Sequence, residues 1–159
     1  MPIPLIVNNT TFQYPADRDS PGWGEEATGW ASEVTTVLNT LIGTGDILET
    51  VANIANNQTI SADVIGLSFD PTTVRGAIAQ YSIYRVSSTT ELVEVGQIFL
   101  SYKSVAATWD MTIIGSSGAN TPLTITSLGQ IQYTTNNMSG TGYSGLIKFV
   151  AKALTQVDL

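Results

Sequence analysis

The chain has 159 residues, about the length of one domain, and its 43% hydrophobic residues are enough to bury a core of its own. Only 12% of the residues are charged, the formal net charge is −7, and the six basic residues are scattered, so no basic patch for nucleic acid or for an anionic membrane is expected. The absence of cysteine and histidine excludes disulfides, thiolate chemistry, the usual general base and the commonest zinc ligands, and we expect no cofactor and no metal.

The N-terminal stretch reads as an arm or hairpin. Two short extended segments, Ile3 to Val7 and Thr10 to Tyr14, are joined at Asn8-Asn9, a pair that tolerates left-handed turn geometry. The stretch lacks the basic region and the long apolar run of a secretory signal, and no later stretch approaches the length of a membrane span. We therefore expect a chain that is made and used in soluble form.

A helix is predicted from Trp23 to Ile42. Apolar residues recur there at spacings of three and four and form one stripe along a helix: Ala27, Trp30, Val34, Val37 and Leu41. An apolar helix face of this kind is expected to be buried against another surface. That surface is either the chain's own β domain or another copy of the chain, and the heptad spacing is compatible with a helical trimer.

A second short helix is predicted after the glycine joint at Gly43 and Gly45. Asp46 and Glu49 stand in the relation of an N-cap and its N3 carboxylate, and Leu48 continues the apolar alternation. The predicted N-terminal segment, residues 1 to 60, thus holds an arm and two short helices.

From residue 61 to residue 159 the pattern predicts an antiparallel β-sandwich, jelly-roll-like, in a protein that is mainly β. Alternating segments follow one another between turns rich in Ser, Asn and Gly. The segment from Leu92 to Tyr102 is apolar on both sides, as expected where a second sheet or a neighbouring subunit covers its outer face. The predicted strands run from about Ala62 to Phe69, Ala77 to Val86, Leu92 to Lys103, Thr108 to Ile114, Pro122 to Thr126, Gly129 to Thr134 and Gly145 to Leu154.

The carboxylates do not form a recognisable hydrolytic pair. Glu91 and Glu94 are at odd spacing on a predicted strand and hence on opposite faces, whereas Glu25 and Glu26 occupy a first helical turn, where acids favour the helix dipole. Serine has no histidine to activate it, and no nucleophile elbow occurs.

Two parts of the sequence suggest ligand sites, one for calcium and one for a sugar. Asp17 and Asp19 suggest calcium, but an EF-hand loop would need a glutamate where Thr28 stands, so a solvated turn is the better interpretation. Tyr143, in the loop from Gly140 to Gly145, is the candidate for a sugar-binding aromatic, although an aromatic in a β-sandwich is more often part of the core.

The opening resembles the N-terminal segment of many virion proteins of tailed phages. Tyr14-Pro15, Asp17 or Asp19, Trp23-Gly24 and Trp30 carry this resemblance. The second half is similar to a β-sandwich module of phage structural proteins, found in head fibres, decoration proteins and tail fibres. It is carried by Tyr81, Ile83, Arg85, Gly96, Tyr102, Trp109, Gly129-Gln130-Ile131, Tyr133, Tyr143, Gly145 and Lys148.

The resemblance implies a non-enzymatic structural protein, made in the host cytoplasm and located on the virion. Fibre proteins with this kind of start usually continue through long repetitive shafts, whereas this chain passes directly into one sandwich. That departure favours a trimeric decoration (cement) protein on the capsid surface, with the major capsid protein and its own copies as partners. Docking is assigned to Phe12, Tyr14, Trp23 and Trp30, and the oligomer interface to Val34, Val37 and Leu41.

Two alternatives stay open. A tail-associated protein or short tail fibre would use the distal loops, including Gly140 to Gly145, to bind a glycan of the host surface. A glycan-degrading enzyme would need two of the scattered carboxylates to converge across a groove.

Overall fold

The structure is a computed structural model that describes residues 3–7, 10–14, 23–41, 43–115, 118 and 121–155. Contacts within the chain divide it into two compact units, residues 1–43 and residues 44–159, here called the N-terminal unit and the β unit. Each is described by itself. The sequence placed the boundary between residues 60 and 61. In the structure, residues 44–60 group with the β unit.

The N-terminal unit is a hairpin with a helix. Strands β1 (Ile3–Val7) and β2 (Thr10–Tyr14) pair antiparallel, with Ile3 opposite Tyr14 and Val7 opposite Thr10. Helix α1 (Trp23–Leu41) contacts both strands, β2 more than β1. These three elements match the predicted hairpin and first helix.

The predicted second helix is wrong, because residues Ile47–Asn53 form strand β3. Read as a helix, the stretch would bury Leu48 and Val51, but both are exposed, whereas Ala52 and Ile54 are buried with the period of a strand. Pairing with the C-terminal strand β10 (Ser144–Thr155) selects the extended form, with Ala52 opposite Ile147.

The β unit consists of two antiparallel sheets. The larger has five strands in the order β3-β10-β5-β6-β7, and the smaller has three in the order β4-β9-β8. The predicted sandwich strands are found close to their expected positions, but the jelly-roll detail of the prediction is not confirmed. The remaining strands are β4 (Ala62–Ser68), β5 (Val74–Val86), β6 (Glu91–Lys103), β7 (Thr108–Gly115), β8 (Leu123–Ile125) and β9 (Gln130–Tyr133).

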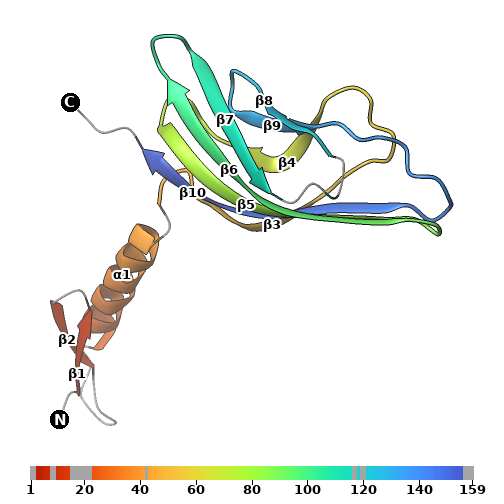
Figure 1. Ribbon diagram of the computed structural model, residues 1–159. Coiled ribbons are helices and arrows are strands. Elements are labelled where there is room, and N and C mark those ends of the chain that lie inside the picture. Colours follow the sequence, from red (N-terminus) through yellow and green to blue (C-terminus); the bar gives the residue numbers. More distant parts are fainter. Residues whose placement is uncertain are drawn as a thin grey trace. The chain divides into compact units, whose positions relative to one another are not determined.

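The hydrophobic core lies between the two sheets. Figure 1 shows β4, β8 and β9 over one face of the five-stranded sheet, and side chains from both sheets form one buried cluster. Along β5, Ala77, Ala79, Tyr81 and Ile83 are buried, so every second residue points to the small sheet. The other face of the five-stranded sheet has no described strand of the β unit over it.

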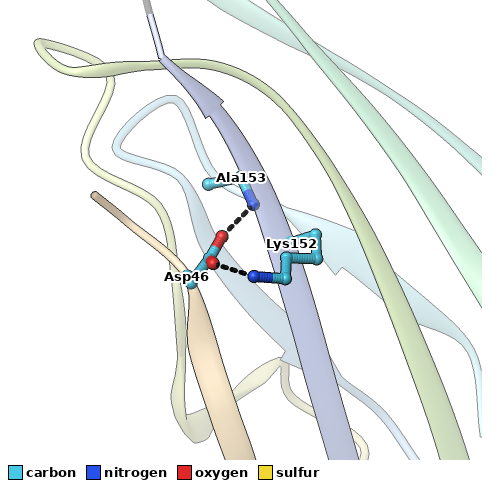
Figure 2. Close-up of polar contacts among 3 residues, drawn as sticks. All are labelled: Asp46, Lys152 and Ala153. Carbon is cyan, nitrogen blue, oxygen red and sulfur yellow. Dashed lines mark hydrogen bonds and ion pairs between the residues drawn. The ribbon is translucent and has the colours of Figure 1, made fainter. Parts of the chain in front are cut away.

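Asp46 fixes the point at which the chain enters the five-stranded sheet (Figure 2). Its Oδ1 accepts a hydrogen bond of 2.7 Å from the backbone N–H of Ala153, and its Oδ2 lies 2.5 Å from Nζ of Lys152. The carboxylate that the sequence suggested as a helix cap instead ties the start of β3 to the end of β10. Gly45 precedes it with φ of 83°, where an added Cβ would lie 2.6 Å from Cγ2 of Val74.

Replacing Asp46 by alanine is expected to lower the free energy of unfolding of the β unit by about 1–3 kcal/mol, because the Ala153 amide and the Lys152 ammonium lose their acceptor. Chemical denaturation followed by fluorescence measures this. The control is Asp63→Ala, which removes an exposed carboxylate bonded to Gln132 and should cost less than ~0.5 kcal/mol. Equal losses in the two variants would contradict the role assigned to Asp46.

Candidate assembly surface

The most unusual surface of the β unit is the uncovered face of the five-stranded sheet, here called the outer face. Its side chains alternate with the core residues along each strand, and many of them are large and apolar. Each apolar member is between 37% and 65% exposed. These members are Val51, Ile78, Tyr84, Val93, Val95, Ile114, Leu146, Val150 and Leu154.

The strand register places these side chains next to one another. Tyr84 lies opposite Leu146 of β10 on one side and opposite Val93 of β6 on the other, which makes an apolar row across three strands. Ile78 lies opposite Phe99 on one side and opposite Lys152 on the other. Between Ile78 and Tyr84, Gln80 of the central strand lies opposite Gln97 and Val150, so polar and apolar side chains are mixed there.

The lysines of the outer face are paired with acids of the same sheet. Lys148 lies 2.8 Å from Glu49, Lys152 lies 2.5 Å from Asp46, and Lys103 lies 2.5 Å from Asp110. Burial and the hydrogen bond to Glu91 raise the pKa of Tyr84, so this hydroxyl stays protonated beside that carboxylate. The face is therefore nearly neutral, although the chain as a whole carries −7.

Shallow open grooves run along the same face. One is lined in part by Glu49, Gln80 and Lys148, and another by Ile78, Val150 and Lys152. Among the described residues that line them, neither groove has two unpaired carboxylates. Their lining suits contact with a surface better than chemistry on a small molecule.

The residues predicted for docking and helix packing belong to the N-terminal unit. On α1, Trp30 is 37% exposed, whereas Val34 and Val37 are half-buried. The side chains of Phe12, Tyr14, Trp23 and Leu41 lie outside the described ones. Leu38, on the same helix, is more exposed than Trp30.

Tyr143, the candidate sugar-binding aromatic, has its hydroxyl committed inside the β unit. The hydroxyl accepts a hydrogen bond of 3.2 Å from Nε of Arg85 and donates one of 2.9 Å to the carbonyl of Ile54. Arg85 is fully buried, and its Nη2 donates to the carbonyl of Asn136 at 2.7 Å. This role of Arg85 was not predicted from the sequence, although the inward position that it shares with Tyr81 and Ile83 on β5 is a signal for it.

Two hydroxyl-rich loops, the turn between β5 and β6 and the loop before β10, meet at one end of the five-stranded sheet. Ser87 Oγ and Thr89 Oγ1 both donate to the carbonyl of Ser139, at 2.7 Å and 2.8 Å. The backbone N–H of Ser88 donates to the carbonyl of Thr141 at 2.9 Å. The turn between β5 and β6 and the loop before β10 are therefore held together.

Glu91 and Glu94 do not converge, and the side chains of Glu25 and Glu26 lie outside the described ones. Glu94 lies opposite Ile83, on the inner face, and accepts a hydrogen bond of 2.6 Å from the Tyr81 hydroxyl, whereas Glu91 points to the outer face. Among the described residues no group of three acidic, cysteine or histidine side chains is placed to hold a metal ion. Asp17 and Asp19 lie outside the described residues. No helix in the described part of the chain is long and apolar enough to cross a membrane.

No family model matches this chain, and no curated protein does. Among solved structures, the tailspike protein of Acinetobacter phage vB_ApiP_P1 is similar to 67% of this chain, with 15% identity and a TM-score of 0.41. The match spans 22% of the tailspike chain.

The Tyr81 hydroxyl should make stability depend on pH in the alkaline range. Burial, and then the hydrogen bond to Glu94, raise the pKa of Tyr81 above that of a tyrosine in the unfolded chain, about 10. Its contribution to stability is thus fully present below about pH 10 and is lost as the pH rises above that value.

The variant Tyr81→Phe is therefore expected to be less stable than the wild type at pH 7, by about 1 kcal/mol, and to lose less stability above about pH 10. Urea denaturation at a series of pH values measures both effects. Parallel alkaline profiles for the two proteins would contradict the assignment.

Proposed function

We propose that this chain is a non-enzymatic structural protein of a tailed-phage virion. Its place would be that of a capsid decoration (cement) protein that binds the outer surface of the major capsid protein shell and stabilises the head. The observation that carries the proposal is the outer face, an apolar, nearly neutral surface on an acidic chain, which suits assembly. The resemblance of Tyr14-Pro15, Trp23-Gly24 and Trp30 to virion proteins adds the setting.

The N-terminal unit is assigned the docking role. Trp30 and Leu38 are exposed on α1, and a partly exposed tryptophan is the kind of residue that anchors protein interfaces. Phe12, Tyr14 and Trp23 are assigned to the same contact with the major capsid protein. Val34, Val37 and Leu41 are assigned to packing between helices of a homotrimer.

Trimerisation would multiply weak docking contacts. Each N-terminal unit can bury only a modest apolar area, but three linked units bind together with an effective concentration set by their linkage. Such a protein would tie neighbouring capsid subunits to one another without any chemical step, and the shell would better resist internal pressure.

A tail position is the second candidate, and the hydroxyl-rich loops favour it. Ser88, Thr89 and Thr141 gather at one end of the sheet, where hydroxyl groups suit hydrogen bonding to sugars. In that case the loops would contact a glycan of the host surface. The Tyr143 hydroxyl would not be free to bond to a sugar, because it is bonded to Arg85 and Ile54.

The copy number of the chain in purified virions decides between the two positions. Quantitative mass spectrometry against the major capsid protein should give an abundance within roughly a few fold of that protein if the chain decorates the icosahedral shell. A few copies to a few dozen would place it at the tail or a single vertex. Absence from virions would overturn both assignments.

Replacing Trp30 by alanine is expected to weaken binding to undecorated capsids at least ~30-fold, as for a tryptophan anchor, while the β unit unfolds at an unchanged temperature. Saturation binding followed by sedimentation measures the loss. Thr36→Ala is the matched control, because Thr36 is exposed on the same helix and its hydroxyl bonds only within it, to Ser32. A Trp30→Ala protein that still saturates capsids would contradict the docking role.

A further inference from the structure

We propose that the outer face of the five-stranded sheet packs against the same face of other copies of this chain. The inference deepens the proposed function by naming a self-association surface on the β unit, separate from the helix residues Val34, Val37 and Leu41. The proposed contact is made by strands of the β unit alone.

The first argument is the exposed apolar content of the face. Val51, Val93, Val95, Ile114 and Leu154 are each more than half exposed, and all lie on strands of one sheet. A soluble protein rarely leaves so much apolar surface together without a partner. Sheets with side chains of this kind on both faces are ordinarily covered on both.

The second argument identifies the partner by charge. The chain carries −7, so two copies repel each other across most of their surface. On the outer face, however, Lys148 is paired with Glu49, Lys152 with Asp46 and Lys103 with Asp110. A face neutralised in this way attracts neither a basic nor an acidic partner by charge, but it removes the repulsion between two copies.

The third argument is that the polar part of the face is complementary to itself. Gln80 and Gln97 lie side by side on β5 and β6, and Ser82 lies next along β5 on the same face. An amide or a hydroxyl both donates and accepts hydrogen bonds, so each can bond to the same group of another copy. A contact in which the same patch serves both partners requires this property.

The fourth argument is size. Strands β5 and β6 have 13 residues each and β10 has 12. At ~3.3 Å per residue along a strand and ~4.8 Å between strands, the five-stranded sheet presents a footprint of roughly 800 Å². That is about the area each partner buries in a stable protein interface, ~800 Å². Two such faces would pack as the sheets of a sandwich do, with interdigitated side chains.

The test places a charge on the outer face at Val95, which is 59% exposed and lies opposite the uncharged Ser82. The wild-type full chain should be oligomeric in light scattering and sedimentation velocity across a dilution series. Val95→Glu and Val95→Lys should each raise the dissociation constant ~100-fold or more, since like charges from the copies meet. The matched control is Ile65→Glu, which places a charge on strand β4 of the small sheet. Ile65 is an apolar residue that is 72% exposed, and the substitution should leave association unchanged.

Mixing the two charged variants identifies the occupant. If copies pack face to face, Val95→Glu and Val95→Lys chains should associate with each other, and native mass spectrometry should show mixed oligomers in excess of either variant alone. Circular dichroism melting confirms that each variant is folded. A monomeric wild type overturns the proposal, whether the face is then covered by another protein or by the chain's own helix. Oligomers that persist unchanged in both Val95 variants also overturn it.

The result is independent of the virion assignment. A chain that is monomeric when purified but abundant on capsids would refute the packing of the outer face and leave the decoration role standing. A chain that self-associates through Val95 but is absent from virions would do the reverse.

Discussion

The β unit depends on an asymmetry between the two faces of its large sheet. Strands of 12 and 13 residues carry apolar side chains on both faces, but the smaller sheet can cover only one. On the covered face Ile83 and Phe149 are buried almost completely. The opposite face keeps Val95 and Leu154 in water, and the proposals for assembly follow from that unequal cover.

Ion pairs keep the outer face of the large sheet nearly neutral. The chain is acidic overall, whereas the lysines of the large sheet are matched to Glu49, Asp46 and Asp110 within the same sheet. Asp46 has a further role, since only 4% of its side chain is exposed and it also binds the backbone of β10. It thus holds the start of β3 in place, shortly after the N-terminal unit ends at Gly43.

Most strands of the β unit were predictable because their local pattern and their tertiary environment agree. In β5 and β6 long runs rich in apolar and aromatic residues lie between turn residues, and in the structure burial alternates along both strands, so the same assignment follows from both. The stretch after Gly45 was predicted as a helix because Asp46 and Glu49 have the spacing of a helix cap and Leu48 continues the apolar alternation, whereas pairing with β10 selects the strand. The role of Arg85 was missed because nothing near it in the sequence shows that Tyr143 and Asn136 will surround it.

The sequence by itself determined the class of the protein: mainly β, acidic, without histidine or cysteine chemistry, with an amphipathic helix from Trp23 and apolar strands in excess of what one sheet face needs, although the second helix that it predicted is wrong. These properties are local, since they follow from residue type and from spacings of two, three and four. Tertiary structure decided that Ile47–Asn53 is a strand, that Tyr143 is tied inward, and which face of the large sheet is left uncovered. Those outcomes depend on pairing between residues about a hundred positions apart, such as Asp46 with Ala153, which local spacing does not encode.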